Sequence, residues 1–191
     1  MILEPLLQHL QAIKPLDEAL RERLINDLEI IEVPKKTMLL RDGEVANYLY
    51  VVLSGLLRSY YIKDGVEICS RFMKENHIVV SVNSFYVRKP GYEFIESMED
   101  STLARIHYDK LQKLYKDHDS FNYTARVLTE QYFTLSEQRL YLLRKQKAEE
   151  RYQFFLSNYA DLMNRVPLQF IATFLGMNLE TLSRIRRKIK G

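Results

Sequence analysis

The sequence predicts an α+β protein in which an antiparallel β jelly-roll barrel lies between helical segments at the two ends of the chain. Residues 29–106 break into eight short apolar runs separated by turn residues, which is typical of a closed antiparallel sheet. Residues 119–147 contain neither Gly nor Pro and predict one long helix. Residues 166–191 have the pattern of a helix-turn-helix.

The composition is that of an ordinary soluble globular protein, with 47% hydrophobic and 28% charged residues. The net charge of +3 is too small to indicate a nucleic-acid partner, but residues 179–191 contain five Lys or Arg and one Glu, which makes a local basic patch. The single cysteine, Cys69, excludes an intramolecular disulfide and fits a reducing compartment. No apolar run reaches transmembrane length, so we expect a cytoplasmic protein without a membrane partner.

Two helices are predicted before the barrel, in residues 2–28, with a break at Pro15 and a cap at Asp17. The predicted strands are 29–33, 37–40, 48–53, 56–62, 66–72, 78–81, 93–97 and 102–106. Glycine-containing turns, Asp64-Gly65 among them, separate several of these strands. Arg88 and Lys89, in a basic turn, are the candidates for contact with the anionic group of an effector, and a solvated loop is the alternative.

The long helix over 119–147 carries apolar residues at heptad spacing, with Arg139 interrupting the stripe. This pattern indicates either a dimer seam or a helix that lies on the sheet of its own chain. We favour the dimer, because a helix of this length without breakers exceeds most helices that pack within a domain. The residues expected at the seam are Phe121, Ala125, Leu128, Tyr132, Leu135 and Leu142.

A further helix over 148–163 leads into the helix-turn-helix. Pro167 suits the first turn of the next helix, where a missing N–H costs nothing. Gly176 ends that helix in the left-handed conformation, and Asn178 caps the one that follows. These three residues predict the turn between the two helices.

The last helix is amphipathic, with Leu182, Ile185 and Ile189 expected to point inward. It can enter a major groove, where Arg184 or Arg187 would donate to guanine O6 and N7 while the outer cations lie against phosphates. The alternative is a terminal helix whose basic face is only solvated. The residues expected to contact DNA are Glu180, Thr181, Ser183, Arg184, Arg187, Lys188 and Lys190.

Catalytic and metal-binding motifs are absent from the sequence. The four histidines are scattered without H-x-H spacing, and neither a G-x-S-x-G elbow nor a P-loop occurs. We therefore expect no enzyme activity, no metal and no cofactor. A metal-dependent barrel enzyme of the cupin kind is the least favoured alternative.

The order of barrel, long helix and helix-turn-helix resembles the cyclic-AMP receptor protein/FNR (Crp/Fnr) family of bacterial transcription regulators. The likeness lies in Asp42-Gly43-Glu44, the strand Tyr48-Leu49-Tyr50-Val51-Val52, Gly55, and Leu175-Gly176 through Arg184-Ile185. It implies a cyclic-nucleotide-binding-like effector barrel with N-terminal helices over 1–118, a dimerisation helix over 119–147 and a DNA-binding domain over 148–191. It also implies a homodimer on a pseudo-palindromic operator, controlled by a small-molecule effector.

Within the recognition helix, Glu180 and Arg184 match the glutamate and arginine with which the family reads bases. Leu179 replaces a further arginine, so the preferred sequence should differ. Because the chain stops at Gly191, we expect a helix-turn-helix without the β-hairpin wing of the family. The lone cysteine excludes an FNR-type iron–sulfur cluster.

The phosphate-binding turn departs from the family's pattern. Val80-Ser81 stands where the family has Gly-Glu, and Gly91-Tyr92 stands where it has Arg and a small residue. The sugar and phosphate partners are missing, so we do not expect cyclic AMP to bind. The sequence thus favours a homodimeric, sequence-specific DNA-binding regulator with an unidentified effector. The alternative is a ligand-sensing or protein-interaction module that does not bind DNA.

Overall fold

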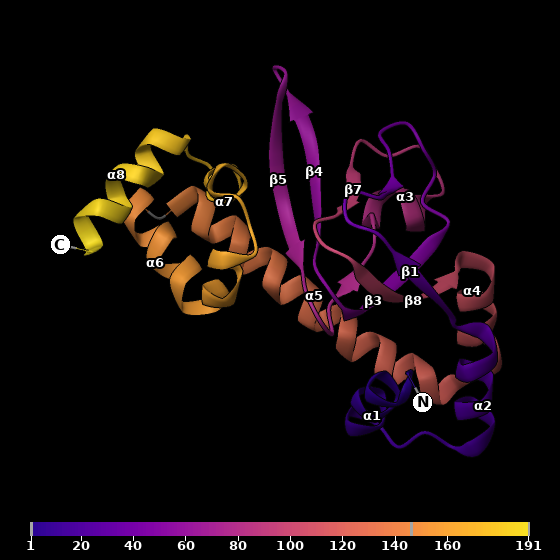
Figure 1. Cartoon of the computed structure of the whole chain (residues 1–191). Helices are drawn as coiled ribbons and strands as arrows, with labels where there is room; N and C mark the ends of the chain where they lie inside the picture. The colour runs from indigo at the N-terminus through magenta and orange to yellow at the C-terminus, as the bar shows by residue number, and fades with distance from the viewer. Residues whose placement is uncertain (1, 146, 191) are drawn as a thin grey trace. The chain divides into compact units, whose positions relative to one another are not determined.

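The computed structural model describes residues 2–145 and 147–190. The chain divides into two compact units: one holds the residues up to Ser59 together with Phe72–Gln131, and the other holds Tyr60–Arg71 together with the residues from Tyr132 onward. The first unit contains most of the sheet structure and the second contains the C-terminal helices (Figure 1). The expectation of an α+β fold with antiparallel sheets and a long helix is confirmed.

All eight predicted strands are present. They are β1 Glu29–Val33, β2 Met38–Leu40, β3 Tyr48–Ser54, β4 Leu57–Lys63, β5 Val66–Met73, β6 Ile78–Val79, β7 Phe94–Ser97 and β8 Ser101–His107. They form two four-stranded sheets, with the strand orders β1-β8-β3-β6 and β2-β7-β4-β5. In the first sheet, Leu103 of β8 lies opposite Ile31 of β1 and Val52 of β3 in antiparallel register. Leu103 and Val52 are fully buried and lie in the core of the barrel.

Two of the predicted glycine turns require glycine for different reasons. Gly55 has φ +104, and a Cβ atom there would lie 2.7 Å from the Cα atom of Ser101, so no side chain fits. Asp64 and Gly65 have φ values of 52° and 78° at the tip of the β4–β5 hairpin. Two successive positive φ values are typical of the type I′ turn that matches the twist of a hairpin.

Helices α1 (Glu4–Ile13) and α2 (Glu18–Asp27) precede the barrel. The carboxylate of Asp17 accepts a hydrogen bond of 2.8 Å from the backbone N–H of Leu20, which confirms the predicted cap. Each helix buries one leucine stripe in the barrel core; the buried leucines are Leu3, Leu6, Leu7, Leu10, Leu20 and Leu24.

Helix α3 (Val82–Val87) was not predicted. Its six residues are too few to show a helical period, and Val82, Phe85 and Val87 resemble the apolar residues of a strand. Phe85 is nevertheless fully buried in the barrel core. The helix ends at Arg88, which adopts the left-handed conformation with φ 57.

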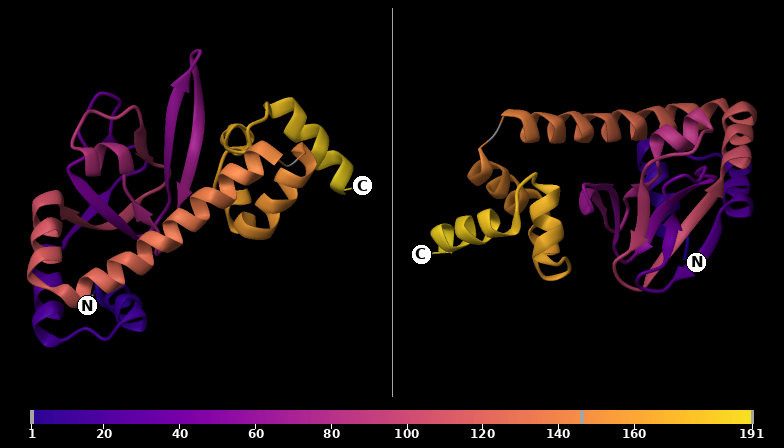
Figure 2. Two further views of the ribbon diagram at one scale, coloured as in Figure 1. Left: turned by 180° about the vertical axis from the view of Figure 1, so that it is seen from behind. Right: turned by 90° about the horizontal axis from the view of Figure 1, so that it is seen from above.

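Two helices follow the barrel: α4 (Tyr108–Asp117) and the long α5 (Asp119–Lys145). Figure 2 shows α1 and α2 beside α4 and the first part of α5, all within the first unit. Lys147, expected at the end of the long helix, is instead the N-cap of the next one. Residue 146 lies outside the described residues.

The C-terminal region consists of α6 (Ala148–Tyr159), a 3-10 turn η1 (Ala160–Asn164), α7 (Leu168–Phe174) and α8 (Leu179–Lys190). The helix predicted over 148–163 therefore changes to the tighter 3-10 form after Tyr159. Tyr152, Phe155 and Leu162 are buried. Phe155 packs edge-on against Phe174 with ring centroids 5.9 Å apart, which joins α6 to α7.

Candidate nucleic-acid interface and barrel pocket

The turn between α7 and α8 has the geometry expected of a helix-turn-helix. We predicted Pro167 in the first turn of α7. In the structure it is the N-cap, one position before the helix begins at Leu168. Gly176 has φ +63 and ends α7, while the side-chain oxygen of Asn178 accepts a hydrogen bond of 2.8 Å from the backbone N–H of Thr181. Both predicted signals are therefore confirmed.

One face of α8 packs on α7. Leu182 and Ile185 are buried, as predicted, and Ile171 of α7 is fully buried with them. Ile189 differs from the prediction, because 39% of it is exposed and it lines a groove with Tyr141.

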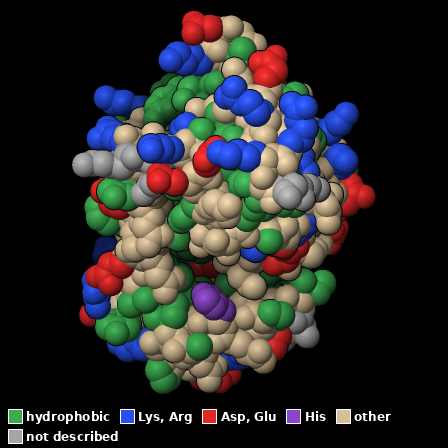
Figure 3. Space-filling model, turned by 90° about the vertical axis from the view of Figure 1, so that its left-hand side faces the viewer, with side chains coloured by type: hydrophobic (Ala, Val, Ile, Leu, Met, Phe, Trp, Pro, Cys, Tyr) green, Lys and Arg blue, Asp and Glu red, His purple; other side chains and the backbone are tan. Residues whose placement is uncertain are grey.

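The opposite face of α8 carries the basic residues. Arg184, Arg187 and Lys188 are exposed, as is Glu180 near the N-terminus of the helix. Thr181 and Ser183 are half-buried at its edges. The side chain of Lys190, the remaining residue expected at DNA, lies outside the described residues. Figure 3 faces this end of the molecule and shows Lys and Arg side chains gathered there, with fewer carboxylates between them.

Lys188 is paired within the chain. Its Nζ atom lies 2.7 Å from the Oε1 atom of Glu149 on α6, and both side chains are exposed. The hydrogen bond from Lys188 and the charge of that residue lower the pKa of the Glu149 carboxyl. A phosphate would have to compete with this carboxylate for Lys188. The charge of Arg184 also lowers the pKa of Glu149, although less than Lys188 does.

Arg139, which interrupts the apolar stripe of α5, holds three segments of the second unit together. Its Nη2 atom donates to the carbonyl oxygens of Phe174 at 2.9 Å and Cys69 at 3.3 Å, and its guanidinium lies 3.7 Å from the centre of the Phe174 ring. Burial lowers the pKa of Arg139 to about 10, so the side chain is still charged at neutral pH. The backbone N–H of Cys69 also donates to the Thr173 hydroxyl at 3.2 Å. Sequence spacing could not reveal this role, because the partners are backbone carbonyls far along the chain.

The residues expected at the dimer seam have different surroundings in the structure. Phe121 is buried, and Ala125 and Leu128 pack against the barrel core of the same chain. Tyr132 is half-buried and Leu142 is buried, whereas 58% of Leu135 is exposed. The first part of α5 therefore has less apolar surface to offer a second copy than its heptad spacing suggested. The large apolar side chains that are exposed on α5 are Tyr123, Phe133, Leu135, Leu140 and Tyr141.

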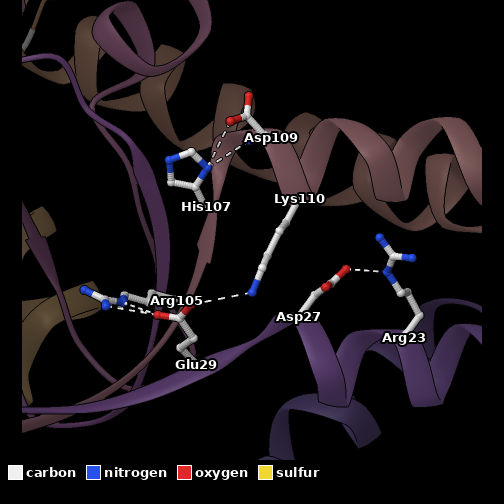
Figure 4. Close-up of polar contacts among 7 residues, drawn as sticks. All are labelled: Arg23, Asp27, Glu29, Arg105, His107, Asp109 and Lys110. Atoms are coloured by element: carbon white, nitrogen blue, oxygen red, sulfur yellow. Dashed lines mark hydrogen bonds and ion pairs between the residues drawn. The ribbon is translucent and has the colours of Figure 1, made fainter.

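The barrel contains a pocket of about 570 Å³. Its apolar wall consists of Met38, Leu39, Leu40, Val45, Ala46 and Ile95, and its polar lining consists of Glu44, Asn47, Tyr48, Tyr50, Ser81 and Arg105. Burial raises the pKa of Tyr50 to about 12. Arg105 stacks on the Tyr48 ring at 4.3 Å, and its Nε and Nη2 atoms each lie 3.0 Å from the Oε2 atom of Glu29. Lys110 reaches the other oxygen of the same carboxylate at 3.5 Å, so two cations share one anion beside the pocket (Figure 4).

The residues at the family's phosphate-binding positions are small, exposed or already hydrogen-bonded within the chain. Gly91 is buried, and a Cβ atom there would lie 3.1 Å from the Cβ atom of Ser84, so an arginine at this position would also require a shift. The guanidinium of Arg88 is already used: it donates to the carbonyl of Ala46 and the side chain of Asn47, both at 2.6 Å. Lys89 is exposed on the same turn. Tyr92, expected to crowd the phosphate, is 60% exposed.

No helix among residues 2–145 and 147–190 is long and apolar enough to span a bilayer. Within the same ranges, no three His, Cys, Asp or Glu side chains are grouped as a metal site would need.

Residues 30–118 match the family described as cyclic nucleotide-binding domain. An anaerobic regulatory protein of Pasteurella multocida (strain Pm70) is 24% identical over 188 residues, which cover 90% of this chain and 68% of that protein. The structure of FixK2 from Bradyrhizobium japonicum is similar with a TM-score of 0.73 at 20% identity, covering 85% of this chain and 84% of the other. A transcriptional regulator of the Crp/Fnr family from Eubacterium rectale gives a TM-score of 0.69 at 20% identity, with 92% and 84% covered.

The domain match covers the barrel, and the alignment with the regulatory protein extends through most of the chain. The fold is that of solved regulators over more than four-fifths of the residues. The resemblance stated from the sequence is thereby confirmed: residues 30–118 match the cyclic nucleotide-binding domain, and the chain is similar in sequence and in fold to regulators of the Crp/Fnr kind.

Proposed function

We propose that this protein is a homodimeric, sequence-specific DNA-binding transcription regulator. The observation that carries the proposal is the division of α8 into two faces: Leu182 and Ile185 are buried while Arg184 and Arg187 are exposed. A helix held by its apolar face with its arginines exposed is suited to reading guanine edges in a major groove. The capped turn at Asn178 supports this reading, because it fixes where the helix begins.

A selection from random duplexes tests the proposal. Two recognition helices related by a dimer axis should recover a two-fold symmetric consensus with half-sites about 10 base pairs apart. Recovery of no consensus would contradict sequence-specific binding. A consensus without symmetry would contradict the dimer alone.

We infer that the dimer forms through the second part of α5. Phe133 and Leu135 are 63% and 58% exposed, which is unusual for large apolar side chains on a helix unless a partner covers them. A suitable variant is Leu135→Asp, because a charge at a dry seam is costly to bury. Leu128 is unsuitable for this test, since it packs against the barrel core and its substitution would also destabilise the monomer. The exposed Gln131 on the same helix provides the control Gln131→Asp.

We also infer that the barrel does not bind cyclic AMP. A cyclic phosphate needs fixed donors to replace its lost hydration, and neither Ser81 nor Gly91 supplies a charged one. Losing one charge-assisted hydrogen bond alone costs about 1.5–3 kcal/mol. Calorimetric titration with cyclic AMP and cyclic GMP should therefore give no binding at micromolar concentrations. A micromolar dissociation constant for either nucleotide would contradict the inference.

A further inference from the structure

The turn between α7 and α8 is held by two arginines from other helices. The Nη2 atom of Arg139, on α5, donates at 2.9 Å to the carbonyl oxygen of Phe174, the last residue of α7. The Nη1 atom of Arg151, on α6, donates at 3.3 Å to the carbonyl oxygen of Gly176. The last carbonyls of a helix lack a partner within the helix, so donors from elsewhere can hold them. The turn is therefore connected by side-chain hydrogen bonds to both of the helices that precede it.

Arg139 holds the turn with a charge that is costly to bury. Burial lowers its pKa, and its Nη1 atom is buried without a hydrogen-bond partner among the residues that the structure describes. The neighbouring groups that affect this pKa include no carboxylate; they are Cys69, Tyr159, Arg71 and Tyr61. A buried charge that lacks a counter-ion costs free energy. An apolar side chain of similar length would avoid this cost, so packing alone does not account for an arginine here.

The contacts of Arg139 fix the orientation of its guanidinium. The group lies 3.7 Å from the centre of the Phe174 ring, and its Nη2 atom also donates to the carbonyl of Cys69 on β5 at 3.3 Å. A planar guanidinium that is held by a ring and two carbonyls has little freedom to move. Helix α8 begins at Leu179, only five residues after Phe174, and the Asn178 cap fixes its first turn. The position of the Phe174 carbonyl therefore largely determines where α8 begins.

We propose that Arg139 is a positioning residue for the recognition helix, because it fixes the start of α8 relative to the second part of α5. The inference rests on the proposed function, in which α5 forms the dimer seam and α8 reads the major groove. The distance between two recognition helices sets the spacing of the half-sites that a dimer can bind. Arg139 thus determines how strictly the dimer selects half-site spacing, without contacting the DNA itself.

The spacing of the half-sites gives a direct test. One added base pair moves the second half-site by about 3.4 Å and rotates it by about 35° around the DNA axis. Competition binding should compare the selected consensus with duplexes whose spacer is one base pair longer or shorter. The wild type should lose much of its affinity for the altered duplexes, because its recognition helices are held at one separation.

The variant Arg139→Met removes the guanidinium and keeps a long side chain. It should bind the consensus about tenfold more weakly, because preorganisation of the recognition helix is lost. It should also lose less affinity than the wild type does when the spacer changes. The slope of affinity against salt concentration should stay the same, because no phosphate contact is removed. The control Arg126→Met removes the same charge from an exposed position on the same helix and should keep wild-type affinity and spacing preference.

A second variant keeps the test valid if Arg139→Met does not fold. Arg139→Lys retains a cation and a donor near the C-terminal end of α7, but it lacks the planar fork that holds two carbonyls. Its affinity and its spacing preference should lie between those of the wild type and Arg139→Met. Circular dichroism and urea unfolding establish which variants are folded before DNA binding is compared.

Three results would overturn the positioning role. An equal loss of affinity at every spacing would show that Arg139 only stabilises the fold, and a smaller salt slope would show that it contacts phosphate. Wild-type affinity and spacing preference in the folded variants would show that it has no role in DNA binding. If the wild type itself recovers no consensus, the proposed regulator is refuted and this role with it. A wild-type consensus with unchanged variants refutes the role of Arg139 alone.

Discussion

Substituting Gly176 by alanine should destabilise the helix-turn-helix more than its small size suggests. The residue has φ +63, where a side chain costs about 1–2 kcal/mol. An added Cβ atom would also lie 3.2 Å from the Cδ2 atom of Leu143 and 3.0 Å from the Nη1 atom of Arg151. The arginine can move, but its Nη1 atom donates to the Gly176 carbonyl at 3.3 Å and that contact would weaken. We expect a total loss of about 2–3 kcal/mol.

A matched control separates backbone strain from crowding. Gly65 has φ +78 at the hairpin tip, and a Cβ atom there would have nothing within 4 Å. Gly65→Ala should therefore lose only the backbone part, about 1–2 kcal/mol. Urea unfolding can be followed by tyrosine fluorescence, since the chain has 13 Tyr and no Trp. If Gly176→Ala is no less stable than Gly65→Ala, the crowding around Gly176 has no energetic effect and the reasoning is wrong.

Three further predictions concern the interface, the dimer and the barrel. Arg184→Ala should cost about 1–3 kcal/mol of DNA-binding free energy and relax preference at one base position. Lys188→Ala should instead weaken all sequences alike and reduce the salt slope by less than about 1, because Glu149 already pairs with Lys188. Competition binding at several salt concentrations distinguishes the two, and wild-type affinity in Arg184→Ala would exclude it as a base reader. Leu135→Asp should sediment as a monomer under conditions in which wild type and Gln131→Asp are dimers; a dimeric Leu135→Asp would place the seam elsewhere. Burial raises the pKa of Tyr50 to about 12 in the folded protein, whereas an unfolded tyrosine has a pKa of about 10. The free energy of unfolding should therefore keep its full value below pH 10 and fall by about 2–3 kcal/mol towards pH 12. In urea unfolding, Tyr50→Phe should lose less free energy of unfolding between pH 10 and pH 12 than the wild type does. The same pH dependence in the variant would show that Tyr50 is not the titrating group.

The sequence determined the elements that depend on neighbouring residues. Asp17 and Asn178 accept from N–H groups three positions later, so their caps can be read directly from the chain. Gly176 and Gly65 mark left-handed positions that other residues adopt only at a cost. The eight strands followed from apolar runs between such turns, and the order of elements then carried the resemblance to the Crp/Fnr family.

Tertiary structure alone decided which surface covers each apolar residue. The heptad spacing of α5 was compatible with a dimer seam and with the chain's own barrel, and the fold assigned Ala125 and Leu128 to the barrel core. Periodicity gives the face of a helix but not the identity of its partner. Ile189 is a related case, because its spacing predicted an inward side chain whereas 39% of it is exposed in the structure.

The barrel pocket also required the fold. Leu40, Tyr50, Ser81 and Arg105 lie on separate segments, and only the pairing of the strands brings them around one cavity. Arg139 binds the carbonyls of Cys69 and Phe174 in the same way, across long stretches of sequence. Local pattern fixes which residues form a strand or helix, since those interactions span only a few positions. Contacts between distant segments depend on how the sheets and helices pack, and one chain sequence gives no direct signal of that packing.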